Sequence, residues 1–171
     1  GGGVVLNGAL LQGRTGNAGA LGSMPVAGEG KSSVQQLIRS ASLYRLEQKI
    51  SAQGRDPDVL WRDPGDWGDI GQPLDAWIKD ATAHLAQAIV ASVSVIDFEA
   101  AVIDGAFPAP VRTRIVKETA KRIAALDQQG LSPFEVVEGT IGGDARAIGG
   151  ASLPLLANYA VDRDVLLRAA G

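Results

Sequence analysis

The sequence predicts an α/β fold, a class that three observations support. Short apolar runs bounded by glycine or proline predict strands, and longer stretches with apolar residues at helical spacing predict helices. The two alternate over residues 98–156, an order typical of parallel strands joined by a right-handed helical crossover. An Asn-Gly pair near the N-terminus predicts an antiparallel hairpin. We therefore expect a mixed sheet with flanking helices.

The composition is that of an ordinary globular chain. Its 171 residues are 46% hydrophobic and 20% charged, which fits one domain spanning residues 1–171. The chain has no cysteine and a single histidine, His84, so disulfides, thiolate metal sites and histidine-rich metal sites are excluded. No apolar run is long enough to span a bilayer and no signal peptide is visible, so we expect a cytoplasmic protein without membrane contact. The net charge of −3 gives the chain no overall attraction to nucleic acid.

The N-terminal region is predicted to be a hairpin followed by a glycine-rich loop. Asn7 and Gly8 separate two short apolar runs and suit a two-residue turn, in which both residues need positive φ. Residues 13–22 are rich in glycine, so their backbone can turn sharply or approach another group closely.

A helix and an irregular connection are predicted next. Ser33 followed by Gln36 matches a capping box, so we expect a helix that begins at residue 33, runs through residue 50 and stops at Gly54. Residues 55–72 are rich in proline and glycine and predict an irregular segment, which two tryptophans attach to a surface.

The second half contains the longest predicted helix and two predicted parallel strands. Pro73 suits the first turn of that helix, which carries one stripe of apolar or small residues: Leu74, Trp77, Ile78, Ala81, Leu85, Ala88, Ile89, Ser92 and Val93. The stripe predicts core packing or a dimer contact. Strands are predicted over residues 98–103 and 134–138, with a helix between them from Pro108 to near Gly130. Further helical positions are Ala145, Ile148, Ser152, Leu155 and Leu156.

Three ordered segments resemble the ROK family of sugar-responsive repressors and sugar kinases. Residues 3–26 contain a glycine turn, a hairpin and the stretch Gly16-Asn17-Ala18-Gly19-Ala20-Leu21-Gly22-Ser23, where family members show Gly-x-Ala-Gly-Glu-x-Gly-His. Residues 100–106 are similar to the family's apolar strand and glycine loop. Residues 143–151 are similar to the start of its C-terminal helix.

The resemblance implies an actin-like ATPase (ribonuclease H-like) architecture of two domains, with sugar and nucleotide in the cleft between them. Residues 1–171 would form most of the second domain, the C-terminal half of a ROK-type protein. The first domain would lie upstream, with a helix-turn-helix in the repressor branch. The chain begins at Gly1 rather than at a methionine, and we expect the upstream domain to be absent from it.

The departures from the family pattern concern the residues that perform chemistry. The family's sugar-contacting glutamate falls on Ala20, its histidine on Ser23 and a second sugar-contacting glutamate on Ile38. The cysteine cluster for structural zinc is missing, and the catalytic aspartate belongs to the upstream part. A general base must lie within hydrogen-bond reach of the proton it takes. We therefore expect no catalytic residue and no metal ligand in this chain.

The candidate carbohydrate-binding residues are Asn17, Gly19 and Ser23 in the glycine-rich loop. The polar side chains of Asn17 and Ser23 suit the hydroxyl groups of a sugar, and loops on rigid scaffolds often carry binding residues. The alternative is that these side chains hydrogen-bond to the backbone of their own loop.

The candidate nucleotide contacts are Gly2, Gly3, Asp104 and Gly105. Exposed backbone N–H groups in a glycine run bind anions, but a glycine run also simply turns the chain into a hairpin. Asp104 and Gly105 follow a predicted strand at the edge where α/β proteins bind ligands. A carboxylate at Asp104 would repel phosphate, which argues against a nucleotide there.

Two further features favour structural interpretations. His84 is expected to be a hydrogen-bonded helix residue, because no second histidine or cysteine accompanies it. The basic residues of the third helix are expected to form a solvated face, although they could also meet DNA or an acidic partner: Arg112, Arg114, Lys117, Lys121 and Arg122.

Together these observations favour the effector-sensing part of a ROK-family transcriptional regulator that responds to a carbohydrate-like molecule. Such a chain would act on DNA through its upstream domain and would form a homodimer. The alternatives are an ATP-dependent sugar kinase, which would bring ATP and magnesium as cofactors, and a structural module that only dimerises.

Overall fold

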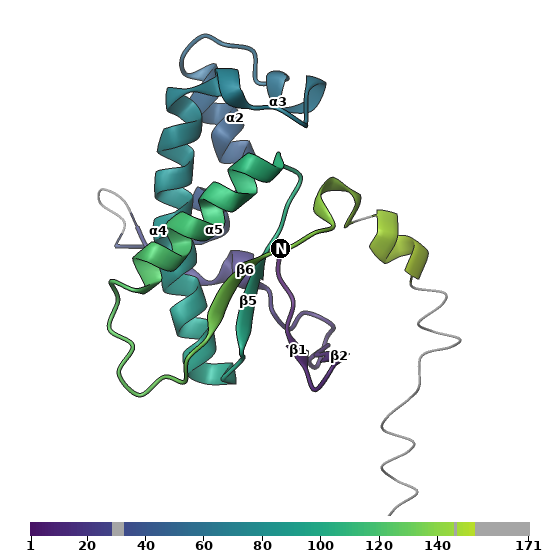
Figure 1. Ribbon diagram of the computed structural model, residues 1–171, viewed down its shortest axis with the longest axis vertical. Helices are drawn as coiled ribbons and strands as arrows, with labels where there is room; N and C mark the ends of the chain where they lie inside the picture. Colours follow the sequence, from purple (N-terminus) through teal and green to yellow (C-terminus); the bar gives the residue numbers. More distant parts are fainter. Residues whose placement is uncertain (29–32, 146, 153–171) are drawn as a thin grey trace, which may run out of the picture.

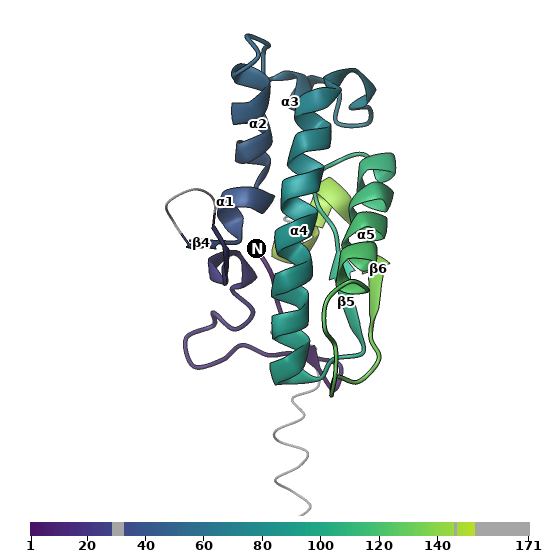
Figure 2. The same ribbon diagram turned by 90° about the vertical axis from the view of Figure 1, so that its left-hand side faces the viewer.

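The molecule is arranged around one long helix, α4 (Gln72–Ile96). The computed structural model describes residues 1–28, 33–145 and 147–152. Helices pack on both sides of α4, with α2 (Leu43–Ser51) on one side and α5 (Ala109–Ile123) on the other (Figures 1 and 2). No helix in the described part of the chain is both long and apolar enough to cross a membrane.

The N-terminal hairpin consists of β1 (Val5–Leu6) and β2 (Ala9–Leu10), paired antiparallel. Asn7 has φ 52° and Gly8 has φ 75°, as a two-residue turn with both central residues in the left-handed region requires. The hairpin prediction is confirmed.

The predicted helix start at Ser33 is wrong. Residues Val34–Gln36 form a strand, β4, which pairs antiparallel with β3 (Pro25–Ala27). The capping-box pattern is local, whereas the pairing with β3 is a tertiary interaction that overrides it. The helix begins instead with α1 (Ile38–Ala41).

The single helix expected up to residue 50 is divided in two. Ser42 has an extended conformation, with ψ 148°, between α1 and α2. The break is held by the indole of Trp77, whose Nε1 donates a hydrogen bond to the Ser42 carbonyl at 3.1 Å. After α2, Gly54 has φ 70°, in agreement with its predicted role as a stop.

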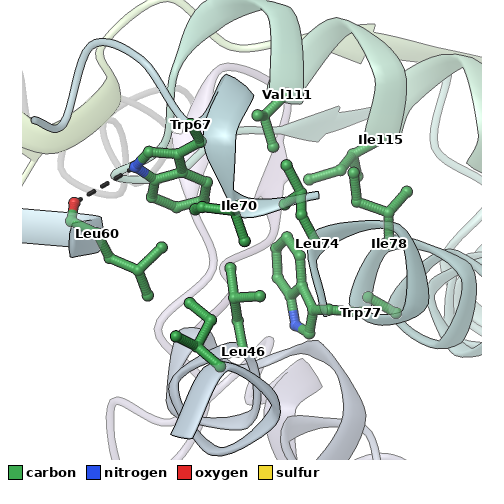
Figure 3. Close-up of a cluster of buried hydrophobic side chains, with 11 residues drawn as sticks. Leu46, Leu60, Trp67, Ile70, Leu74, Trp77, Ile78, Val111 and Ile115 are labelled. Carbon is green, nitrogen blue, oxygen red and sulfur yellow. Dashed lines mark hydrogen bonds between the residues drawn. The ribbon is translucent and has the colours of Figure 1, made fainter. Parts of the chain in front are cut away.

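The irregular connection over residues 55–72 contains two short helices, α3 (Val59–Arg62) and η2 (Gly68–Ile70). Trp67 is buried, and its Nε1 donates to the Leu60 carbonyl at 3.3 Å (Figure 3). Trp61 is 51% exposed and donates to Glu47. Only one of the two tryptophans therefore anchors the segment in the core.

The apolar stripe of α4 packs in the core, which is one of its two predicted roles. Trp77, Ile78 and Ala81 pack with Leu46 and Ile50 of α2 and with Val111 and Ile115 of α5 (Figure 3). Farther along, Ala88 joins a second cluster near β3, and Ile89 joins a third beneath β5.

The strand–helix–strand unit predicted in the second half is confirmed. Strands β5 (Ala100–Ile103) and β6 (Glu135–Glu138) are parallel and in register, and α5 connects them. Helix α5 ends at Ile123, before the expected position near Gly130. Residues 145 and 147–152 are helical, while Leu155 and Leu156 lie outside the described residues.

The expected single mixed sheet is not formed by the described residues. Their strands make three separate two-stranded sheets, β1–β2, β3–β4 and β5–β6. The strands are two to four residues long, so each offers few ladder hydrogen bonds. Both strand directions occur in the molecule, but in different sheets.

Candidate functional site

The most highly connected polar group at the carboxyl ends of β5 and β6 is the carboxylate of Asp104. Its Oδ2 accepts hydrogen bonds from the backbone N–H groups of Ile141 at 3.0 Å and Gly142 at 2.9 Å. Its Oδ1 accepts from the N–H of Gly105 at 2.8 Å and lies 3.3 Å from Nη1 of Arg112. The side chain of Asp104 thus joins the loop after β5 to the loop after β6.

Arg112 connects this cluster to the end of β6. It lies in the first turn of α5, which Pro108 and Pro110 place directly after the loop. Its side chain is only 16% exposed, and its Nε lies 3.5 Å from Oε2 of Glu138. That separation is an ion-pair distance, and the Nε has no hydrogen-bond partner among the described residues.

Two glycines leave room for side chains in the loop after β5. A Cβ at Gly139 would lie 2.5 Å from the Cβ of Asp104, and a Cβ at Gly105 would lie 2.3 Å from the ring of Phe107. Neither contact is sterically possible without a shift of the neighbouring group. The loop after β6 can therefore approach Asp104 as closely as it does because position 139 has no side chain, whereas the glycine at position 105 leaves room for the Phe107 ring within the loop after β5.

The electrostatic environment favours the ionised form of Asp104. The hydrogen bond from the Gly142 N–H is the largest influence and lowers the pKa of Asp104 below its ordinary value of 3.8. Burial raises the pKa in opposition, and the N–H groups of Gly105 and Ile141 and the Arg112 charge lower it further. The net result is a carboxylate that stays charged.

The predicted nucleotide contacts fall in two places. Asp104 and Gly105 lie at the edge of β5, where the Gly105 N–H is already bonded to the Asp104 carboxylate. Gly2 and Gly3 instead lie against the loop at Gly19. A Cβ at Gly2 would be 2.7 Å from the Gly19 carbonyl oxygen, and a Cβ at Gly19 would be 2.7 Å from the Cα of Gly3. The N-terminal glycines thus allow two backbone segments to touch.

The predicted carbohydrate-binding residues lie on one exposed loop. Asn17 and Ser23 are both exposed, and Ser23 ends the short helix η1 (Leu21–Ser23). Neither side chain hydrogen-bonds to another protein group within the stretches 1–28, 33–145 and 147–152, so the alternative that they serve their own backbone finds no support. Gly19 has φ 76° and provides the sharp turn between them.

The loop lies next to Ile38, the third position at which the resemblance places a functional side chain. A Cβ at Gly22 would be 3.6 Å from the Cβ of Ile38, and the Leu37 N–H donates to the Met24 carbonyl at 2.9 Å. Ser23 and Ile38, which are distant in sequence, are therefore neighbours. The side chains at these two neighbouring positions carry a hydroxyl and an alkyl group.

His84 and the basic helix differ from their expectations. His84 is buried on α4, but its Nδ1 has no hydrogen-bond partner among the described residues, so the expected satisfied histidine is wrong in that respect. On α5, Lys117 and Lys121 are exposed as predicted. Arg112 and Arg122 are not part of a solvated face, because Arg112 contacts Asp104 and Arg122 donates to Thr82 at 2.9 Å.

Sequence reasoning missed Arg112 and Glu138 as members of a site. The available signal was the short separation between Asp104 and Arg112, with two prolines that start a helix between them. In the described residues, no three acidic or histidine side chains converge on a position that could hold a metal ion.

A shallow groove lies elsewhere on the surface. It has a volume of about 410 Å³ and runs between the C-terminal half of α4 and the segment after α5. Its lining includes Gln87, Val90 and Leu126. None of the predicted site residues lines it, so the groove has no connection with the loop of Asn17 or with Asp104.

Comparison with known proteins places the fold. No model of a known protein family matches the sequence, and no curated protein matches it. Among solved structures, a ROK family protein from Streptococcus pneumoniae TIGR4 in complex with sucrose has 18% identity and a TM-score of 0.63 over 91% of this chain and 54% of its own.

Two sugar kinases are similar to the same extent. A ROK hexokinase from Thermus thermophilus has 21% identity and a TM-score of 0.59, covering 87% of this chain and 53% of its own. A ROK family glucokinase from Streptomyces griseus, in complex with glucose and AMPPNP, has 16% identity and a TM-score of 0.60, covering 88% of this chain and 55% of its own. The chain thus spans about half the length of these proteins and shares with that half the α/β fold of ROK proteins.

Proposed function

We propose that this chain is the C-terminal, effector-sensing half of a ROK-family transcriptional regulator, and that it binds a carbohydrate-like molecule without phosphorylating it. The observation that carries the proposal is the neighbourhood of Ser23 and Ile38. The fold brings these two positions together, and the resemblance assigns an imidazole and a carboxylate to them. The hydroxyl and alkyl groups present cannot replace the sugar contacts of an imidazole and a carboxylate, because an alkyl group makes no hydrogen bond and neither group carries a charge.

Binding of a polyol is compatible with the same loop. Asn17 offers an amide and Ser23 a hydroxyl, both exposed, and each group can donate and accept hydrogen bonds. The similar Streptococcus pneumoniae protein was solved with sucrose and the Streptomyces griseus protein with glucose. These ligands support a carbohydrate as the chemical class for this chain.

The proposed mechanism is allosteric. The chain would form the second domain of an actin-like architecture, with the ligand between it and an upstream domain. A ligand that binds the closed arrangement more tightly than the open one shifts the population toward closure. In a homodimeric regulator, that shift would change the affinity of an upstream helix-turn-helix for DNA by the same coupling free energy.

The second candidate is an ATP-dependent sugar kinase. It is favoured by the kinases among the similar structures, and it would require ATP, magnesium and an upstream catalytic aspartate. The charge at Asp104 argues against it, because a carboxylate at the strand edge repels phosphate and already occupies the N–H groups of Gly105, Ile141 and Gly142.

A ligand screen by thermal shift on the full-length protein tests the proposal. We expect one carbohydrate or derivative to raise the melting temperature, because a ligand that binds only the folded state stabilises it. Asn17→Ala and Ser23→Ala should each weaken that response. Ser94→Ala is the matched control, since Ser94 is an exposed hydroxyl on α4 whose Oγ donates to the Ala91 carbonyl. An unchanged response in both loop variants would refute the assigned site.

A further inference from the structure

The donors around Asp104 have the arrangement of an anion-binding site. Ile141 has a right-handed helical conformation, with φ −89° and ψ −38°, and Gly142 follows with φ 65°. Successive residues of this kind turn their N–H groups toward one point and form a concavity that binds anions. Both N–H groups point at the same oxygen, Oδ2 of Asp104.

Other groups complete this concavity on separate elements. Oδ1 of Asp104 accepts hydrogen bonds from the Gly105 N–H, at the end of β5, and from the Arg112 guanidinium, on α5. An arginine beside convergent backbone N–H groups is a common way to hold a carboxylate or a phosphate. We name this set the anion cradle: the N–H groups of Gly105, Ile141 and Gly142 with the guanidinium of Arg112.

We propose that the Asp104 carboxylate is a covalently attached anion that fills the anion cradle. It thereby holds the loops after β5 and β6 permanently in one arrangement. Without Asp104, a free oxyanion would have to bind in the cradle to stabilise that arrangement. The inference stands on the contacts of the cradle and does not depend on whether the protein is a regulator or a kinase. Gly139 supports it, because any side chain at that position would occupy the space of the Asp104 carboxylate.

The proposal differs from a purely structural role in one measurable respect. If Asp104 merely caps its own loop, its removal destabilises the protein and nothing external replaces it. If Asp104 stands in for a free anion, its removal leaves an empty cradle that a small tetrahedral oxyanion can enter.

The experiment compares Asp104→Ala with the wild type in inorganic phosphate and in chloride of equal ionic strength, with thermal unfolding as the readout. We expect Asp104→Ala to melt lower than the wild type in chloride and to recover in phosphate with saturable dependence, by about 3 °C at ten times the dissociation constant. The wild type should show no such phosphate-specific rise. Asp104→Ala combined with Arg112→Gln should lose the recovery.

The matched control is Asp75→Ala. Asp75 also faces an arginine, with its Oδ1 at 2.6 Å from Nη1 of Arg114, but the pair lies on the exposed faces of α4 and α5. Phosphate should not specifically stabilise this variant. An equal phosphate response in the wild type and Asp104→Ala, or none in a folded Asp104→Ala, would overturn the proposal.

A second measurement requires no variant. In the wild type, the amide resonances of Ile141 and Gly142 should move together as the pH falls through the folded-state pKa of Asp104, which lies below 3.8, because both N–H groups bond to its carboxylate. Resonances that stay unchanged while the protein remains folded would contradict the proposal, even if Asp104→Ala fails to fold.

Discussion

Asp104 shows how a charge is accommodated at a site where a sequence pattern alone predicts conflict. The sequence predicts that a carboxylate at this strand edge repels phosphate, and the structure shows which groups it attracts instead. Three N–H groups and a guanidinium surround it, and hydrogen bonds to a charged group contribute more than those between neutral groups. The residue is therefore stabilising in its ionised form.

Its protonation should be visible in the acid stability of the protein. Because folding lowers the pKa of Asp104, its contribution is fully present above the ordinary value of 3.8 and is lost as the pH falls through the folded-state pKa. At pH 7, Asp104→Asn should lower the free energy of unfolding by about 2 kcal/mol. Urea unfolding from pH 7 to pH 2 should show this difference shrinking in acid; a constant difference would contradict the assignment.

Gly19 offers a second test at the residue scale. An alanine at this position combines the strain of φ 76° with a Cβ only 2.7 Å from the Gly3 backbone. Gly16→Ala is the control, since Gly16 has φ 74° and a Cβ added there would meet nothing within 4 Å. We expect Gly16→Ala to cost about 1 kcal/mol and Gly19→Ala about 2 kcal/mol more. Equal losses in chemical denaturation would show that the close approach of the two segments is unimportant.

At the scale of elements, α4 determines the stability of the fold. It contributes side chains to all three apolar clusters, and Trp77 both fills the largest of them and holds the break between α1 and α2 through Ser42. Its apolar stripe was predicted from helical periodicity alone, because a 3.6-residue pattern sustained over many turns has few other interpretations.

A comparison of Trp77 with Trp61 tests this arrangement. Trp77 is buried, so Trp77→Ala should reduce the free energy of unfolding by about 4 kcal/mol through lost packing and a residual cavity. Trp61 is 51% exposed, so Trp61→Ala should cost less than about 1 kcal/mol. Urea denaturation of both variants measures the difference. A larger loss of unfolding free energy from Trp61→Ala than from Trp77→Ala would show that the core does not lie around Trp77.

The element predictions held where the local signal agreed with the tertiary contacts. The turn of Asn7 and Gly8 and the first turn of α4, which contains Pro73, depend on residues adjacent in sequence, so they could be predicted. Strand β4 could not, because its pairing with β3 is a contact between separate segments and the Ser33–Gln36 pattern favoured a helix. Arg112 was missed for a similar reason, since its partner depends on where α5 lies relative to the end of β5.

At the scale of the whole molecule, the chain has the fold of about half of a ROK protein, with little sequence identity to the solved examples. The resemblance in ordered motifs predicts a ligand site at the loop of Asn17 and Ser23, and the structure places Ile38 beside that loop. The contacts of Asp104 with the loop after β6 could not be deduced, because they depend on the backbone conformation of Ile141 and Gly142.

The central claim is that the loop of Asn17 and Ser23, next to Ile38, binds a ligand without performing chemistry. Its most direct test is the formation of ADP and sugar phosphate by the full-length protein, incubated with ATP, magnesium and the hexoses and derivatives used in the thermal-shift screen. We predict no sugar-dependent ADP formation, even with a compound that raises the melting temperature. Sugar-dependent ADP formation with an equal amount of sugar phosphate would contradict the account and establish the kinase alternative.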